Sequence, residues 1–316
     1  MEITMLTIQD RLMDQPKTEA AASVVILGNF DGIHLGHRTL LHEADQLAGQ
    51  MGLRRRVITF SPHPKQAMGQ PDFRLIYSEE QKAMIMEETQ WVDELILLSF
   101  DEKLRTMKPE DFFTEVLLKR YQAKAVVVGY YFHFGVKGSG DTALLQKLCQ
   151  TYGLQCRVVQ KLEIVDESVS SSRIRELLQS GRMEEANLLL GRPYFVEGKV
   201  SYGKQLGRKL SMPTINVLMK EERMAPQKGV YISCTHTEKG IFPSISNMGN
   251  NPTVGGESLR METHILEFSG DLYEQTVRVE LLKFVRPEQK FESVQALQKQ
   301  VALDITAAKE YFITKR

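Results

Sequence analysis

The sequence has few cysteines and no excess of charge of either sign. Its 316 residues include three cysteines, 40 Lys and Arg, and 40 Asp and Glu, so the formal net charge is zero. Cys149, Cys156 and Cys234 form no CxxC pair, which argues against a zinc knuckle or a disulfide framework. The chain also lacks the basic excess typical of proteins that bind nucleic acid or anionic membranes. We therefore expect a cytoplasmic protein with no nucleic-acid partner and no membrane partner.

Long hydrophobic runs and a secretory signal are missing as well. No stretch approaches the roughly 20 apolar residues that a membrane-spanning helix needs. The opening segment, MEITMLTIQDRLMDQPK, carries acidic residues where a signal peptide would be basic, and it has no unbroken apolar core. With 42% hydrophobic and 25% charged residues, the composition is that of a globular protein, and the length suits two domains of ordinary size.

The first half of the chain alternates short apolar runs with amphipathic stretches. The expected strands span residues 23–27, 56–60, 94–100, 123–128 and 155–159, and the expected helices span residues 37–51, 78–89, 109–121 and 141–152. Strands that are apolar throughout and separated by helices indicate a doubly wound parallel sheet covered on both faces. Ligands of such sheets bind beyond the carboxyl ends of the strands.

After residue 191 the pattern changes to short alternating segments, among them YFVEGKVSYG, GVYISCTHT and QTVRVELLKFV. Gly, Pro and Asn separate these segments, which predicts a small antiparallel β-barrel or sandwich. Residues 291–313 predict one closing helix, and a helix over residues 172–179 joins the two halves. We therefore predict an α/β domain over residues 1–190, of Rossmann-like type, and a β-barrel domain closed by a helix over residues 191–316.

Two histidines, His34 and His37, follow the first apolar run in the segment VVILGNFDGIHLGHRTLL. A strand that ends at Gly28, a tight loop through Gly32 and a following helix form an anion site from backbone N–H groups and the positive end of the helix dipole. Gly32 and Gly36 let the backbone approach a phosphate chain closely. Residues three apart share one helix face, so both imidazoles can donate to the same polyphosphate. Zinc would need a third ligand that the spacing does not offer, and two ordinary surface histidines are the remaining alternative.

The stretch GNFDGIHLGH resembles the HxGH signature of the bacterial bifunctional riboflavin kinase/FMN adenylyltransferase (FAD synthetase) family. The segments FSPHP (residues 60–64), VVGYYFHFG (127–135) and SSSRIR (170–175) continue the resemblance. In the family, two hydroxyls and an arginine of the last motif hold ATP phosphates, which implies this role for Ser171, Ser172 and Arg175. Such hydroxyls also cap ordinary helices, and Arg offers a fork to phosphate oxygens. The ATP-binding residues that the resemblance implies in the first loop are Gly28, Asn29, Phe30, Asp31, Gly32 and Gly36.

The second half is similar, in order, to the riboflavin kinase module of the same family through YGKQLGRKLSMPTINV, SNMGNNPTV and METHILEF. The family's PTxN turn implies that Thr214 and Asn216 bind Mg²⁺ and ATP, and hard oxygen ligands suit that cation. The family's catalytic carboxylate corresponds to Glu262, the expected general base for the ribityl 5′-hydroxyl. From strand alternation alone, Glu262 could equally be an outward-facing residue without a catalytic role. The further ATP-binding residues implied here are Gly203, Gly207 and Arg208.

Five residues are implied in flavin binding by the same resemblance: His63, Tyr131, Phe134, Asn247 and Arg286. Aromatic rings can stack on a flavin, but aromatic residues after a strand also serve loop packing. A packed loop histidine is the alternative for His63, and a surface salt bridge is the alternative for Arg286.

The resemblance covers nearly the whole chain and implies two successive reactions. The barrel phosphorylates riboflavin to FMN with Mg²⁺ and ATP, and the first domain adenylylates FMN to FAD with release of pyrophosphate. The expected partners are therefore riboflavin, FMN, FAD and ATP, with flavin as substrate and product. The family usually has Asp or Asn at the position of Tyr131, so a monofunctional riboflavin kinase with an impaired adenylyltransferase half is one alternative. A non-catalytic flavin- or nucleotide-binding regulator is another, and the sequence leaves the oligomeric state open.

Overall fold

The computed structural model describes residues 4–17, 21–70, 72–165, 167–201, 213–253 and 256–314. Contacts between Cα atoms divide the chain into two compact units, Met1–Ser171 and Ser172–Arg316. Within the described residues, no helix combines the length and the apolar character that crossing a membrane would take.

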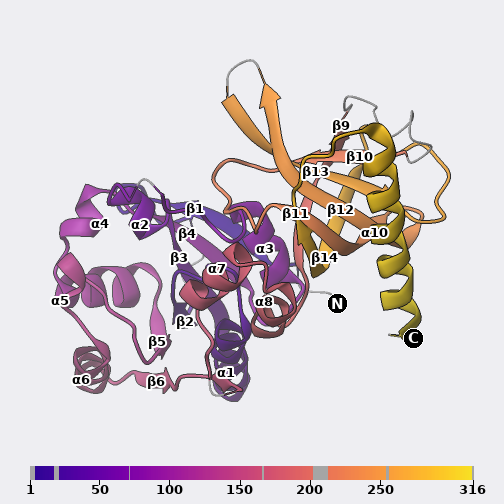
Figure 1. The fold of residues 1–316 in the computed structure, drawn as a ribbon. Coiled ribbons are helices and arrows are strands. Elements are labelled where there is room, and N and C mark those ends of the chain that lie inside the picture. Colours follow the sequence, from indigo (N-terminus) through magenta and orange to yellow (C-terminus); the bar gives the residue numbers. More distant parts are fainter. Residues whose placement is uncertain are drawn as a thin grey trace. The chain divides into compact units, whose positions relative to one another are not determined.

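The first unit contains a six-stranded parallel sheet in the order β1-β4-β3-β2-β5-β6 (Figure 1). Its strands are β1 (Leu6–Asp10), β2 (Ser23–Leu27), β3 (Arg54–Ser61), β4 (Glu94–Ser99), β5 (Ala123–Gly129) and β6 (Gln155–Val159). The central strand β2 is buried over its whole length because helices cover both faces, which explains its unbroken apolar run. The predicted doubly wound parallel sheet is confirmed. The order of the sheet changes direction at β2, and the crevice at the carboxyl end of such a strand is where ligands bind.

The helices of the first unit alternate with its strands. They are α1 (Leu35–Met51), α2 (Pro64–Ala67), α3 (Glu79–Glu87), α4 (Glu102–Thr106), α5 (Pro109–Asp111), the π-helix η1 (Phe112–Arg120), the 3₁₀ turn η2 (Val136–Gly138) and α6 (Thr142–Tyr152). The helix α1 ends where Gly52 adopts a left-handed conformation (φ 63°) that glycine tolerates best. The core on one face joins η1 and α6 to the sheet through Phe113, Leu117 and Leu145. A short hairpin, β7 (Glu163–Ile164) and β8 (Glu167–Ser168), follows β6.

The second unit is built on a closed antiparallel barrel in the order β10-β13-β12-β11-β14-β9. Its strands are β9 (Tyr194–Ser201), β10 (Ile215–Leu218), β11 (Gly229–Thr237), β12 (Gly240–Thr253), β13 (Gly256–Ile265) and β14 (Thr276–Pro287). The helix α10 (Val294–Thr314) packs on the outer face of the barrel, where Ala308 joins a cluster with Val230, Ile232 and Ile245 (Figure 1). The predicted barrel closed by a helix is confirmed.

Two helices lead into the barrel, α7 (Ser171–Gln179) and α8 (Met183–Leu190). The contact division places both with the second unit, except for Ser171, the first residue of α7. Leu178 accepts a hydrogen bond from the backbone N–H of Gln227 at 2.8 Å, and the Asn187 side-chain amide donates to the carbonyl of Leu281 at 2.8 Å. The contact division thus lies earlier than residue 190, and the domain boundary at 190 stays a prediction.

Candidate active sites

The loop between β2 and α1 has an unusual backbone. Phe30 (φ 48°), Gly32 (φ 85°) and Ile33 (φ 40°) all have positive φ. Phe30 and Ile33 have fully buried side chains. A non-glycine residue in the left-handed region costs about 1–2 kcal/mol, which packing must offset. The fold therefore holds this loop in a conformation that the sequence does not favour locally, as is common at ligand-binding sites.

Hydrogen bonds from distant segments hold the same loop. The Asp31 carboxylate accepts from the backbone N–H of Ile76 at 2.9 Å, and the carbonyl of Asp31 accepts from the Ser171 hydroxyl at 2.8 Å. The carbonyl of Asn29 accepts from the Lys82 ammonium at 3.1 Å. Asp31 is buried, so its carboxylate shapes the loop. The Ser171 hydroxyl, predicted on ATP phosphate, makes its hydrogen bond to the loop backbone here.

The two predicted imidazoles lie against each other at the start of α1. The rings of His34 and His37 stack with centroids 3.7 Å apart and planes 15° apart. His34 is the N-cap of α1, and its Nδ1 accepts the backbone N–H of His37 at 3.3 Å, which leaves Nε2 of a neutral His34 ring as the N–H donor. A Cβ at Gly36 would lie 3.2 Å from the His34 ring, so glycine makes room for the stack. The arrangement gives two adjacent donors at a helix N-terminus, which suits a polyphosphate.

Ser172 and Arg175 follow on α7. The buried side of this helix is formed by Ile174, Leu177 and Leu178, while Ser172 is exposed and Arg175 is half-buried. Both side chains therefore point away from the buried side of α7.

His63 lies at the carboxyl end of β3. Its ring is buried, stacks on Phe73 with centroids 4.4 Å apart, and accepts the backbone N–H of Lys65 at 3.2 Å as the N-cap of α2. These are the contacts of a packed loop histidine, the alternative that the sequence left open for His63. The flavin-binding role of His63 stays a prediction.

The aromatic residues of the loop after β5 differ in their exposure to solvent. Tyr131 is 74% exposed, and its ring lies 3.8 Å from that of Tyr130 between centroids. Phe134 is 6% exposed and packs in the core beside Phe112 and Phe132. Of the two aromatic residues predicted to bind flavin here, only Tyr131 presents its ring to solvent, and Phe134 contributes to the packing under the loop.

The barrel brings three predicted site residues into one row. Glu262 on β13 lies opposite Asn216 on β10 and opposite Asn247 on β12. Cross-strand partners project from the same face of a sheet. The flanking residues Met261 and Thr263 are fully buried inside the barrel, whereas Glu262 is exposed on the outside. The carboxylate therefore stands between two carboxamides.

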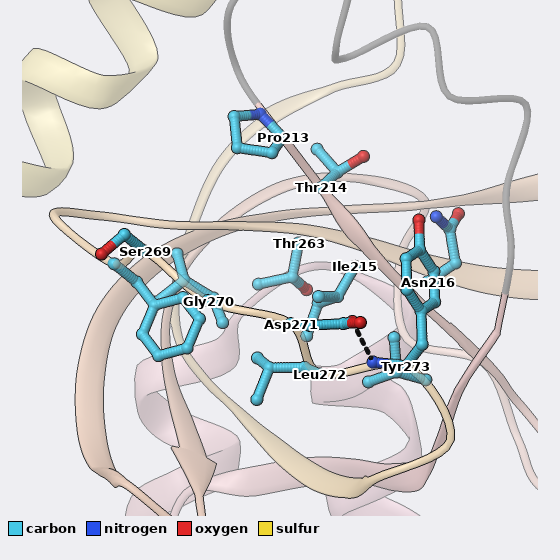
Figure 2. A pocket seen from close by; sticks show the side chains of 13 residues that line it. Pro213, Thr214, Ile215, Asn216, Thr263, Ser269, Gly270, Asp271, Leu272 and Tyr273 are labelled. Atoms are coloured by element: carbon cyan, nitrogen blue, oxygen red, sulfur yellow. Dashed lines mark hydrogen bonds between the residues drawn. The ribbon is translucent and has the colours of Figure 1, made fainter.

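Two cavities adjoin at this row. The first has a volume of about 410 Å³ and is lined by Thr214, Asn216 and the loop of residues 268–273 (Figure 2). The second has a volume of about 340 Å³ and is lined by Asn247, Glu262, Arg286 and residues of α10. Thr214 lines both cavities. Asn216 thus lines the first cavity alone, the predicted base and the flavin ligands of the barrel line the second, and Thr214 lies where the two meet.

The turn that carries Thr214 is tied to the barrel. The ring N–H at Nδ1 of His264 donates to the carbonyl of Pro213 at 2.9 Å. The Arg260 guanidinium lies 3.5 Å from Oδ1 of Asn216, which places a cation beside this side chain. On the opposite wall, the Asp271 carboxylate accepts the backbone N–H of Tyr273 at 2.9 Å and closes the loop (Figure 2).

Thr214 and Asn216 suit Mg²⁺ in the chemistry of their donors. Both offer neutral oxygens at the edge of a cavity, and Mg²⁺ usually takes few protein ligands and completes its octahedron with phosphate oxygens and water. In the described part of the chain, no group of three or more His, Cys, Asp or Glu side chains is placed to hold a metal ion.

Arg286 is both a cavity wall and a bridge between β14 and α10. Its Nη2 donates to the Asp304 carboxylate at 2.7 Å and its Nε at 3.1 Å, and Gln300 donates to the same carboxylate at 2.9 Å. The Asp304 side chain is 4% exposed and that of Arg286 is 17% exposed, so the carboxylate of this pair is buried and the guanidinium is partly buried. Sequence analysis missed Asp304, for which the signal was a single acidic residue in the apolar stretch VALDITAA.

Gly203, Gly207 and Arg208 lie outside the described residues. A third cavity of about 570 Å³ lies at the carboxyl ends of β1, β3 and β4, where Arg11, Ser61 and Phe100 line it.

The chain is similar to known proteins along nearly its whole length. A family model described as FAD synthetase matches residues 16–173, and one described as riboflavin kinase matches residues 190–312. The chain is 33% identical over 292 residues to the bifunctional riboflavin kinase/FMN adenylyltransferase of Escherichia coli (strain K12), covering 92% of each chain. It is 33% identical over 306 residues to the protein of that name from Bacillus subtilis (strain 168), covering 95% of this chain and 96% of the relative. A crystal structure from Streptococcus pneumoniae, described as a macrolide-efflux protein, is 30% identical with a TM-score of 0.87 and covers 96% of this chain and 99% of that one.

Proposed function

This chain belongs to the bifunctional riboflavin kinase/FMN adenylyltransferase family, and we propose that it phosphorylates riboflavin to FMN at the barrel and adenylylates FMN to FAD at the β2–α1 loop. Each step consumes one ATP, and the second releases pyrophosphate. The single observation that carries the kinase assignment is the position of Thr214, which lines both cavities. A phosphoryl donor in one cavity and an acceptor in the other would meet there.

In the kinase step, ATP occupies the cavity of Asn216 and riboflavin occupies the cavity of Arg286. The Glu262 carboxylate accepts the proton of the ribityl 5′-hydroxyl, whose oxygen forms the bond to the γ-phosphorus while the bond to the β-phosphate oxygen breaks and ADP leaves. Thr214 and Asn216 would hold Mg²⁺, which would supply positive charge against the phosphates of ATP. The Arg260 guanidinium beside Asn216 adds to that field.

In the adenylyltransferase step, the FMN phosphate needs no general base because its oxygens are already anionic. One oxygen forms a bond to the α-phosphorus of ATP, the bond to the bridging oxygen breaks, and pyrophosphate leaves. Stacked His34 and His37 donate to the departing pyrophosphate, and the N-terminus of α1 adds its dipole. Ser172 and Arg175 bind the phosphates as the family motif implies.

For FMN at this site, we propose Tyr131 as a ligand through its exposed ring, with Tyr130 packed behind it. His63 at the end of β3 lies on the same edge of the sheet. The monofunctional alternative rests on Tyr131 alone, and the agreement of the whole chain with bifunctional relatives favours the two-step function.

One assay separates the three functions. The protein is incubated with riboflavin, ATP and Mg²⁺, and the flavins are resolved by chromatography. FMN and FAD together support the proposal. FMN alone indicates an inactive first unit, and unchanged riboflavin indicates a regulator.

Variants then assign the adenylyltransferase step to its site. His34→Asn and His37→Asn should each reduce FAD formation from supplied FMN about 100-fold, with riboflavin phosphorylation unchanged. His42→Asn, on the exposed part of α1, is the matched control. Tyr131→Asp restores the residue type usual in the family. If Tyr131 limited the rate, this variant would make more FAD than the parent chain.

The location, the domain bounds and the partners of the chain are also proposed. We assign the chain to the cytoplasm, with domains over residues 1–190 and 191–316, with riboflavin, FMN, FAD and ATP as its partners, and with neither nucleic acid nor membrane. The formal net charge of zero supports the last point, since partners of nucleic acid or anionic membranes are usually basic. Fractionation of cells, with the flavin assay on each fraction, tests the location.

A further inference from the structure

Lys82 on α3 is a buried lysine in the first unit. The residue is 2% exposed, and its ammonium donates to the carbonyl of Asn29 at 3.1 Å and lies 3.5 Å from the Thr59 hydroxyl. Burial of a charged group costs several kcal/mol unless other groups compensate. Burial lowers the pKa of Lys82, while the negative charges of Asp31 and Glu79 act to raise it. A core position with no other task would be filled at lower cost by an apolar side chain.

The carbonyl that accepts from Lys82 belongs to Asn29, the residue directly before the positive-φ residues of the loop. The Thr59 hydroxyl donates to the same oxygen at 3.0 Å, so both lone pairs of the Asn29 carbonyl are engaged. The next residue, Phe30, has φ 48°, and four residues later His34 caps α1. The peptide that joins Asn29 to Phe30 is therefore fixed from β3 on one side and from α3 on the other.

We propose that Lys82 is a positioning residue of the adenylyltransferase site, which fixes the Asn29 carbonyl and so holds the β2–α1 loop in the form that presents His34 and His37 side by side. This inference rests on the proposed function of the first unit. Lys82 touches neither nucleotide nor flavin in this scheme and acts through the loop. Without its ammonium, the strained peptide at Phe30 loses one of two anchors, and the imidazole pair loses its fixed geometry.

The test compares Lys82→Met with Lys103→Met. Methionine keeps most of the apolar stem of Lys82 and removes the ammonium. Lys103 is the matched control because its ammonium also donates to a backbone carbonyl in the first unit, that of Leu12 at 3.2 Å, but it is exposed and lies away from the loop. Thr59→Val removes the other donor to the same carbonyl and serves as a second variant should Lys82→Met fail to fold.

Three measurements are made on each full-length variant: FAD formation from FMN, FMN formation from riboflavin, and the ring resonances of His34 and His37 in ¹⁵N-histidine-labelled protein. For Lys82→Met we expect kcat/KM for FAD formation to fall about 10- to 100-fold, with a larger change in kcat than in KM for ATP. We expect FMN formation within about twofold of the parent and displaced or broadened resonances of both imidazoles. Lys103→Met should match the parent in all three.

The outcomes separate this inference from the proposed function. Parental FAD formation by Lys82→Met, or a loss that FMN formation shares equally, overturns the positioning role. If the parent chain itself makes no FAD, the proposed function of the first unit fails. The imidazole spectra then decide Lys82 alone, since unmoved resonances refute the inference and displaced ones support it.

Discussion

Glu262 lies directly opposite Asn216 across the pair of strands β13 and β10. The partner on the other side, on β12, is Asn247. The Glu262 carboxylate is exposed, whereas Asn216 is buried and Asn247 is half-buried. Its two cross-strand partners are thus neutral carboxamides, and neither is a second carboxylate. A carboxylate in this position can accept a proton from a neighbouring alcohol.

The first prediction concerns Glu262→Gln. The amide keeps the shape of the side chain but cannot accept the 5′-hydroxyl proton, so FMN formation from riboflavin should fall about 100-fold or more. FAD formation from supplied FMN should be unchanged because it takes place in the other unit. The measurement is the rate of each step with its own substrate.

The matched control for this variant is Glu267→Gln. Glu267 follows β13, and its side chain is 83% exposed beside Lys309. The control should retain both activities. Parental FMN formation by Glu262→Gln would remove this residue from the reaction.

The second prediction concerns Asp304→Asn. Asp304 holds the Arg286 guanidinium at the wall of the second cavity, and a charge-assisted pair of this kind contributes about 2 kcal/mol. Loss of the pair should let the arginine move and raise KM for riboflavin about 10-fold, with a smaller change in kcat. Steady-state kinetics with varied riboflavin measure both constants.

Lys309→Met, on the same helix but exposed, is the control for Asp304. If Asp304→Asn instead lowered kcat about 10-fold and left KM for riboflavin unchanged, Asp304 would serve the chemistry or the fold rather than the flavin cavity.

Strands that are buried on both faces could be predicted from sequence, since their apolar runs need no tertiary information. The strand β1 could not be predicted in this way. Its segment LTIQD exposes Leu6 and buries Asp10, the reverse of the usual order. It becomes a strand because it pairs with β4 and because Asp10 accepts a hydrogen bond from Arg120, 110 residues later in the chain.

The candidate sites show the same limit. Thr214, Asn216 and Glu262 belong to short motifs that can be found in the sequence. Lys82 and Asp304 could not be found because their roles depend on contacts with segments 53 and 18 residues away. The acidic residue within VALDITAA breaks an apolar pattern, but only the fold shows which group Asp304 holds.

The third prediction concerns stability in acid. Asp10 has a side chain with no exposure, and it accepts hydrogen bonds from Arg120 at 2.8 Å and from the Tyr121 hydroxyl at 2.7 Å. Burial acts to raise the pKa of Asp10, but the hydrogen bonds from Arg120 and Tyr121 outweigh it and hold the pKa below its usual value. The ionised carboxylate therefore stabilises the folded state above about pH 4, and this contribution is lost as the pH falls through the lowered pKa.

Asp10→Asn should thus lower the free energy of unfolding by about 3 kcal/mol at pH 7, because the Arg120 cation loses its anionic partner and keeps only its bonds to the carbonyls of Arg11 and Asp14. The difference from the parent chain should shrink as the pH falls toward 3. Urea unfolding between pH 3 and 7 measures it, with the exposed Asp72→Asn as the control. A difference that stays constant with pH would show that the charge of Asp10 is not what stabilises the fold.

The fourth prediction concerns the order in which the thiols react. A hydrogen bond from Cys149 lowers the pKa of Cys156, whereas its own hydrogen bond to Cys156, together with burial, raises the pKa of Cys149. Burial raises the pKa of Cys234 to about 11. Because the thiolate is the reactive form, iodoacetamide at pH 8 should modify Cys156 first, as followed by mass spectrometry of peptides over time. Cys149→Ala removes the hydrogen-bond donor and should slow the modification of Cys156 by raising its pKa. Faster modification of Cys234 than of Cys156 in the parent chain would contradict the prediction, since Cys234 is also half-buried and differs chiefly in how its thiolate is stabilised.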